Sequence, residues 1–74
     1  MEDTLKQVIA DIMKIDKSII NDDTDFKNDL KCDSIELFSI IMAMEEKYGK
    51  EIPNDKLMNI KTVGDAIKAI KEIM

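Results

Sequence analysis

The sequence predicts an all-α protein, a four-helix bundle with a long loop between its first and second helices and a short third helix. Two observations carry this prediction. Apolar residues make up 45% of the 74-residue chain but aromatic residues only 4%, so aliphatic side chains and Met must build the core. Apolar residues also recur at helical spacing in three stretches, and typical capping residues precede them. A chain of this length is expected to form a single domain over residues 1–74.

The first helix is expected from about Thr4 to Lys14, because its apolar residues follow the i, i+3, i+4, i+7, i+8 spacing of one helical face. Asp3 or Thr4 can cap its N-terminus. The apolar face consists of Leu5, Val8, Ile9, Ile12 and Met13.

From Ile15 to Cys32 the helical periodicity fades, and this stretch is expected to be a long loop. Its middle, residues 21–25, is rich in Asn, Asp and Thr side chains, which compete for local backbone hydrogen bonds. The acids do not fit the EF-hand pattern, because neither register supplies the required Gly and Glu, so we expect them to be solvated or to cap backbone groups. The residues expected to pin the loop to the core are Ile19, Ile20, Phe26 and Leu30.

The second helix is expected from Ser34 to about Tyr48, with Gly49 in the left-handed conformation just past its end. Asp33 is a preferred N-cap residue, and Glu36 can bond back to the backbone of Asp33, so the two predict a capping box. Ser34 then occupies the first helical position. Its side chain is not needed for the cap there, and the local field favours an anion such as a phosphate. A serine so placed is a good attachment point for a phosphate ester.

A helical wheel divides the apolar residues of this second helix into two groups. The wider stripe is assigned to the core and contains Leu37, Ile40, Ile41, Met44 and Tyr48. Ile35, Phe38 and Met42 lie on a different face, adjacent to Ser34 in projection. Either the helix is buried on two sides, or these residues form a contact patch for a partner. In the second case the surrounding acids would attract Lys and Arg of that partner; they are Asp33, Glu36, Glu45 and Glu46.

A short third helix is expected over about Lys56 to Asn59, capped by Asn54 or Asp55. A fourth helix follows Thr62, because Asp65 lies three residues later and completes a variant capping box. Its apolar face consists of Val63, Ala66, Ile67, Ile70 and Ile73.

Composition excludes several classes of function. The net charge of -5 gives the chain little reason to bind nucleic acid. His is absent, which removes the usual general base and the commonest zinc ligand, so we expect no catalytic residues and no metal site. The single cysteine, Cys32, cannot form an internal disulfide and is expected to pack as a small residue. With no signal peptide or long apolar run, a cytoplasmic protein without a membrane span is expected.

The segment Asp33-Ser34-Ile35-Glu36-Leu37 resembles the Asp-Ser-Leu attachment motif of acyl carrier proteins, with Ile35 in place of the usual Leu. The resemblance extends over nearly the whole chain at consistent spacing. It includes Phe26-Lys27-Asn28-Asp29-Leu30, the run from Met42 to Gly49, Glu51-Ile52-Pro53, and the run from Thr62 to Ile67. The chain departs from the family pattern at Lys31-Cys32, where Gly-Ala is frequent, at Ser39, where a glutamate is common, and at Phe38, which is bulkier than the usual aliphatic residue.

This resemblance implies that Ser34 carries 4'-phosphopantetheine, transferred from coenzyme A by a phosphopantetheinyl transferase, the holo-synthase. The thiol of this arm would carry acyl groups as thioesters, partly enclosed between the helices. The partners would be acyl-chain synthesis and acyltransferase enzymes with basic docking patches, and we expect a monomer that is a substrate of enzymes and not itself an enzyme. The residues expected at the docking surface are Ile35, Glu36, Phe38, Met42, Glu45 and Glu46.

Three functional hypotheses follow. The leading one is a carrier for fatty acid synthesis or a related acyl pathway. A dedicated carrier for polyketide, aminoacyl or D-alanyl groups would present the same second helix. An unmodified acidic helical interaction module belongs to a different class, and in it Ser34 would be only a residue of the first helical turn.

Overall fold

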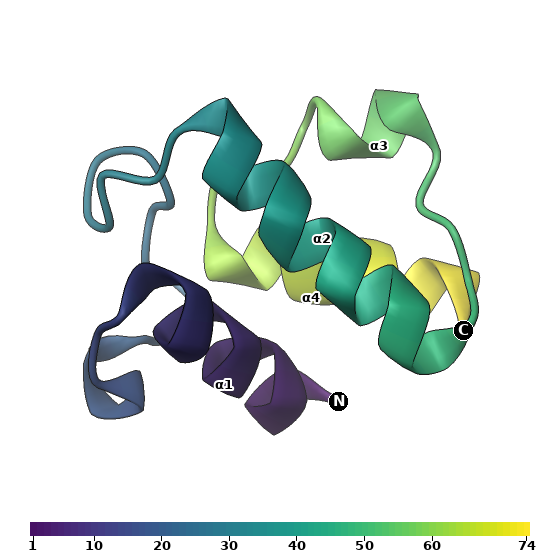
Figure 1. Cartoon of the computed structure of the whole chain (residues 1–74). Coiled ribbons are helices and arrows are strands. Elements are labelled where there is room, and N and C mark those ends of the chain that lie inside the picture. Colours follow the sequence, from purple (N-terminus) through teal and green to yellow (C-terminus); the bar gives the residue numbers. More distant parts are fainter.

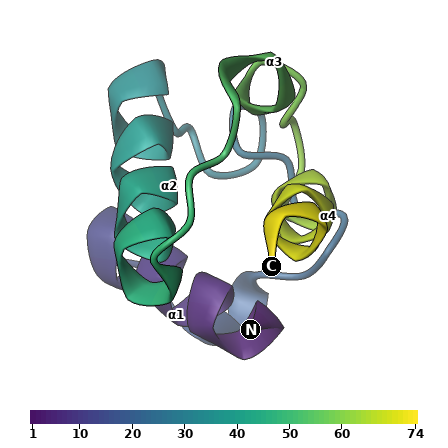
Figure 2. The ribbon, with the colours of Figure 1, turned by 90° about the vertical axis from the view of Figure 1, so that its right-hand side faces the viewer.

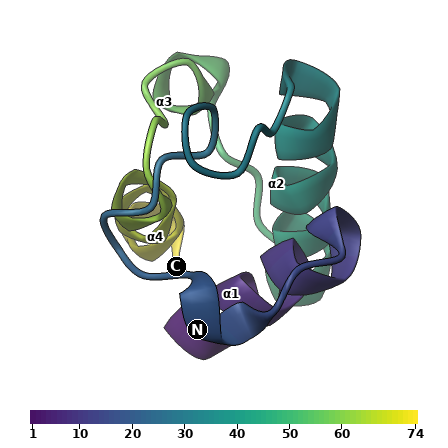
Figure 3. The same ribbon diagram turned by 90° about the vertical axis from the view of Figure 1, so that its left-hand side faces the viewer.

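The computed structural model describes residues 1–74, which form four α-helices and one short 3-10 helix (Figure 1). Viewed from the right-hand side of Figure 1, the helices surround the interior, with α2 and α4 facing one another, α1 below and α3 above (Figure 2). The opposite view shows the same arrangement, with the long loop passing in front (Figure 3). The predicted four-helix, all-α architecture with a short third helix is therefore confirmed. The elements are α1 (Glu2–Met13), η1 (Lys17–Ile19), α2 (Ser34–Tyr48), α3 (Asn54–Leu57) and α4 (Val63–Ile73).

The core is aliphatic, as the composition predicted, and 17 buried apolar residues form one cluster. Every long helix contributes to it, and so do the loop and the segments that flank α3. On α2, Ile40, Ile41 and Met44 are buried, whereas Leu37 and Tyr48 at the ends of the same stripe are half-buried. The largest fully buried side chains are Leu5, Ile9, Ile40, Ile41, Met44, Val63 and Ile70.

Helix α1 begins two residues before the predicted start and has no side-chain cap, so neither Asp3 nor Thr4 has the expected role. It ends at Met13, because Lys14 takes the left-handed conformation with φ of 58° and donates its N–H to the Ala10 carbonyl. This is the usual way in which a helix satisfies its last carbonyls, although the position is more often a glycine.

Helix α3 covers Asn54–Leu57, which is earlier than the predicted range of Lys56 to Asn59. The reason is that Pro53, and not Asn54 or Asp55, occupies the N-cap, and its carbonyl accepts the first hydrogen bonds of the helix. An ion pair between Lys56 and Glu72 ties α3 to α4. The hydrogen bond from Lys56 holds the pKa of the Glu72 carboxyl below its usual value.

The polar residues of the long loop bind its own backbone. Asp25 Oδ1 accepts hydrogen bonds from the N–H groups of Lys27 at 2.9 Å and Asn28 at 2.8 Å. The Asp29 carboxylate accepts the Asp25 N–H at 2.8 Å, and Asn21 Oδ1 accepts the Asp23 N–H at 2.9 Å. These side chains therefore cap backbone groups, which was the expectation for this acidic stretch.

The apolar residues of the loop only partly follow the prediction. Ile20 and Phe26 are buried and Leu30 is half-buried, but Ile19 is 59% exposed, so the prediction was wrong for Ile19. The cause is the 3-10 turn η1, which Asp16 caps by accepting the Ser18 N–H at 2.9 Å. Ile19 is the last residue of this turn and faces solvent, whereas Ile20 has an extended backbone and is buried.

An antiparallel bridge fastens the loop to the start of α4. The Phe26 N–H donates to the Lys61 carbonyl, and the Val63 N–H donates to the Thr24 carbonyl, each at 2.9 Å. The Phe26 carbonyl in turn accepts the Cys32 N–H at 2.8 Å. The main chain of Phe26 thus connects the segment before α4 with the residues directly before α2.

Candidate functional site

The predicted capping box at the start of α2 is complete. The Glu36 N–H donates to Asp33 Oδ1 at 2.8 Å, and the Asp33 N–H donates to Glu36 Oε1 at 3.1 Å. Asp33 has an extended backbone, with φ of -85° and ψ of 176°, and the helix begins at the next residue. At the other end, Gly49 closes the helix with φ of 64°, again as predicted. Both ends of α2 are therefore determined by local sequence.

Ser34 is the first residue of α2, and it is exposed. Its hydroxyl takes no part in the capping box, because Asp33 and Glu36 satisfy one another. The N–H groups of the first helical turn have no carbonyl acceptor within the helix, and they form the positive end of the helix dipole. The position therefore combines an accessible hydroxyl with a field that favours a bound phosphate.

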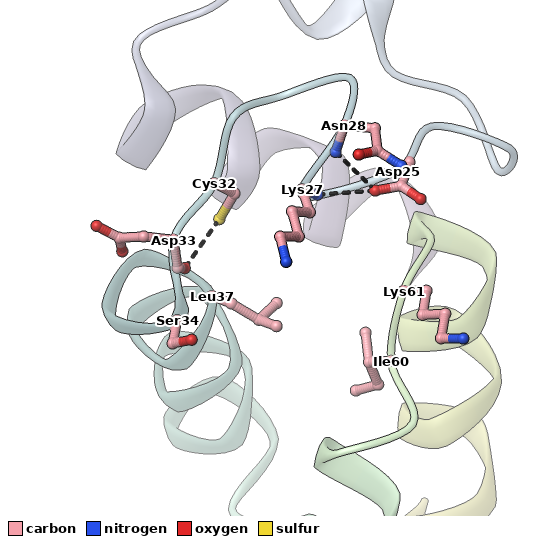
Figure 4. A pocket seen from close by; sticks show the side chains of 9 residues that line it. All are labelled: Asp25, Lys27, Asn28, Cys32, Asp33, Ser34, Leu37, Ile60 and Lys61. Atoms are coloured by element: carbon pink, nitrogen blue, oxygen red, sulfur yellow. Dashed lines mark hydrogen bonds between the residues drawn. The ribbon is translucent and has the colours of Figure 1, made fainter.

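A polar pocket of about 270 Å³ opens beside Ser34, between α2, the loop and the segment before α4 (Figure 4). Lys27 and Asn28 come from the loop, while Leu37 of α2 and Ile60 of the segment before α4 face the pocket from opposite sides. Cys32 lies above the start of the helix.

An apolar groove of about 620 Å³ adjoins this pocket at Ser34 and lies between α2 and α3. Phe38 comes from α2, while Leu57 and Met58 come from the end of α3. The polar pocket and the apolar groove share Ser34, Leu37 and Ile60 as lining residues. Ser34 therefore stands where a charged environment meets a hydrocarbon-lined one.

Sequence reasoning did not identify the residues that line this groove from α3. Leu57 and Met58 are apolar, but a four-residue helix is too short to show a helical period. Their approach to α2 depends on the course of the chain after Gly49. No local pattern could have revealed that Ile60 would line both cavities.

The second apolar face of α2 is exposed. Ile35 is 76% exposed, Phe38 51% and Met42 65%, and we call these three residues the exposed patch. The interpretation in which α2 is buried on two sides is therefore wrong. Ser39, beside the patch, donates its hydroxyl to the Ile35 carbonyl at 3.0 Å, so it places no charge there.

The acidic residues around the exposed patch differ in what they bind. Glu46 is exposed, whereas Glu36 belongs to the capping box. Glu45 is half-buried, and its Oε2 accepts the Ile52 N–H at 2.6 Å. Sequence reasoning missed this contact because the two residues are seven apart and meet only through the turn that follows the helix.

Cys32 is buried, as predicted, and its Sγ–H donates to the Asp33 carbonyl at 3.6 Å. Burial, followed by the negative charges of Glu36 and Asp33, raises the pKa of the thiol from an ordinary 9.0 to about 11. Because the thiolate is the reactive form, this group is a poor nucleophile near neutral pH.

We expect Cys32 to react with an alkylating reagent at pH 8 about a hundredfold more slowly in the folded protein than in urea, since the thiolate fraction falls tenfold for each pKa unit. Mass spectrometry of timed samples measures both rates. The unmodified chain should be used, in which Cys32 is the sole thiol. Equal rates in the folded and unfolded chain would contradict the buried position of the thiol.

Comparison with known proteins gives a consistent result. The family model for the phosphopantetheine attachment site matches residues 3–70. An acyl carrier protein of Lactobacillus acidophilus is 48% identical over 67 residues, which cover 90% of this chain and 84% of that protein. An acyl carrier protein of Rickettsia massiliae is 44% identical over 72 residues, covering 97% and 84%. A solved structure described as an acyl carrier protein of Mycobacterium tuberculosis superposes with a TM-score of 0.90 at 30% identity, over 96% of this chain and 95% of that one. No helix here combines the length and apolar character that a membrane crossing requires.

Proposed function

The chain belongs to the acyl carrier proteins, the family that shares the phosphopantetheine attachment site, and on this premise we propose that Ser34 carries the 4'-phosphopantetheine arm. The observation that carries the proposal is the position of Ser34, an exposed hydroxyl at a capped helix start between a polar pocket and an apolar groove. When bound, the arm supplies a thiol that holds acyl groups as thioesters. Fatty acid synthesis is the general role of the family.

The residues around Ser34 suit such an arm. Asp33 fixes the start of the helix, so the hydroxyl is held at a defined place on the surface. Leu37 and Ile60 form a wall that leads from the polar pocket to the groove, where Leu57 offers further apolar surface. Burial of hydrocarbon against such side chains is favourable by about 25 cal/mol per Å². The groove can therefore shelter apolar cargo while the polar pocket receives the charged end of the arm.

Acyl carrier proteins act with synthase and transferase enzymes, and we infer that the exposed patch and Glu46 form the docking surface for them. A coenzyme A-dependent holo-synthase would be the first partner, followed by acyl-chain enzymes with basic patches. The protein would present its acyl group to other enzymes and so serve as their substrate. It would be a cytoplasmic monomer, and residues 1–74 would form one carrier domain. Exposed apolar residues next to acidic ones are typical of transient interfaces of this kind.

The proposed function is tested by intact-protein mass after incubation with coenzyme A and a phosphopantetheinyl transferase. We expect the mass to increase by one phosphopantetheine. If several transferases leave the mass unchanged, the carrier proposal is wrong and the unmodified interaction module is favoured. The mass of the acyl group on protein isolated from its native cell then separates fatty acyl cargo from polyketide, aminoacyl or D-alanyl cargo.

Charge reversal at Glu46 is expected to slow association with a basic partner at low salt by about two- to fivefold, the effect of losing an exposed ion pair. The fold should be unchanged, because Glu46 is exposed. Stopped-flow association at low and high salt measures the effect, and screening should reduce it at high salt.

Glu45 needs a different variant, because its carboxylate accepts the Ile52 N–H. Glu45→Lys would leave that N–H unpaired and lower the free energy of unfolding by about 1–3 kcal/mol. Glu45→Gln keeps an acceptor oxygen and removes only the charge, so it is the matched variant for association. If the association rates depend on neither charge nor salt concentration, the proposal of an acidic docking surface is wrong.

A further inference from the structure

We propose that Lys27 is a positioning residue for the arm, and that its ammonium pairs with the phosphodiester formed on Ser34. This inference rests on the proposed function. It assigns to the polar pocket the charged end of the arm, whereas the apolar groove takes the other end.

The orientation of Lys27 is the first observation. Its side chain extends from the loop into the polar pocket, and its Nζ points toward the side on which Ser34 and Leu37 lie (Figure 4). Lys61 also lines the pocket, but its ammonium is directed away from the centre (Figure 4). Lys31, although closer to Ser34 in the sequence, does not line the pocket at all.

The ammonium of Lys27 has no carboxylate partner. The ion pairs of the chain use Lys6, Lys17, Lys56 and Lys71. The backbone of Lys27 is nevertheless fixed, because its N–H donates to Asp25 Oδ1 at 2.9 Å and the preceding Phe26 is buried. A cation on an anchored stretch of chain therefore faces the attachment site without an anion of its own.

The charges near Ser34 explain why such a cation matters. A phosphodiester on Ser34 would lie between Asp33 and Glu36 in the sequence, in a chain with a net charge of -5. The helix N-terminus offsets this repulsion by the equivalent of only about half a positive charge. Lys27 supplies a full positive charge from the pocket side. An ammonium binds phosphate as a point charge and needs no fixed hydrogen-bond geometry, which suits a group that enters with a flexible arm.

Pairing at Lys27 would also orient the arm. The polar pocket and the apolar groove share Ser34, Leu37 and Ile60. With the phosphodiester held on the Lys27 side, the rest of the arm is directed across Leu37 and Ile60 into the apolar groove. Lys27 therefore favours the sheltered orientation of the arm over an extended one.

The test compares amine reactivity with and without the arm. The rate of acetylation of each lysine is measured by peptide mass spectrometry on the unmodified protein and on the protein that carries phosphopantetheine. We expect the rate at Lys27 to fall about two- to fivefold at low salt when the arm is present, because the ion pair covers the amine. The fall should shrink at high salt. Lys31 is the matched control and should react at the same rate in both forms.

A second measurement uses the phosphorus atom directly. In the modified protein, Lys27→Gln should shift the ³¹P resonance of the phosphodiester, whereas Lys31→Gln should leave it in place. An unchanged Lys27 rate on a protein whose mass shows the arm, or an equal fall at Lys31, would overturn the inference and leave the proposed function standing. If Ser34 accepts no arm, both proposals fail together.

Discussion

Replacement of Ser34 by alanine is expected to abolish phosphopantetheine addition completely, because no other hydroxyl stands at the junction of the polar pocket and the apolar groove. The substitution should prevent attachment of the arm without destabilising the fold. The hydroxyl does not contribute to the capping box, and alanine has the highest intrinsic helix propensity. The mass of Ser34→Ala should stay constant during incubation with coenzyme A and transferase, and its urea midpoint should match that of the wild type.

Ser39 provides the matched control for this prediction. It lies on the same helix, is also exposed, and donates its hydroxyl to the Ile35 carbonyl. Ser39→Ala should accept one arm, as the wild type does. Addition of equal mass to Ser34→Ala and to the wild type would show that the attachment site lies elsewhere in the chain.

Phe26→Ala is expected to lower the free energy of unfolding by about 3–5 kcal/mol, the usual cost of deleting a buried aromatic side chain. Phe26 is only 3% exposed. Stability of about 0.05–0.15 kcal/mol per residue is typical of folded proteins, so this variant should lose a large share of the total for so short a chain. Urea denaturation followed by circular dichroism measures the change.

Ile19→Ala is the control, because Ile19 lies in the same loop but is 59% exposed. Its free energy of unfolding should change by no more than about 0.5 kcal/mol. Similar losses in the two variants would mean that the loop is not anchored by Phe26. A small loss in Phe26→Ala alone would mean that the surrounding core closes over the cavity.

The sequence was sufficient to predict features that arise within a few residues of one another. Asp33 and Glu36 reach each other across one helical turn, and so do Thr62 and Asp65, so both capping boxes were predictable. Gly49 at the end of α2 is equally local. The position of Ser34 at a capped helix start followed from these short-range interactions, and the resemblance to carrier proteins supplied the identity of the arm.

Features that depend on the path of the chain could not be predicted in this way. The 3-10 turn reversed the expected direction of Ile19, and the carbonyl of Pro53 moved the start of α3. The hydrogen bond from Ile52 to Glu45 bridges a turn. The exposure of Phe38 depends on the open groove between α2 and α3, which leaves this side chain 51% exposed. The 3-10 turn and the Pro53 cap are local but do not follow the helical period, whereas the contact of Glu45 and the exposure of Phe38 depend on tertiary packing.

The antiparallel bridge between the loop and the start of α4 has a consequence for synthesis of the chain. Residues 24–26 are held by residues 61–63, which are synthesised much later than the loop. Contacts between such distant residues form late, because the loop between them must close first. We therefore expect the region around Ser34 to mature only after residues 61–63 have left the ribosome. A nascent chain would have its serine before it had a finished acceptor, and loading would have to wait for the segment that precedes α4.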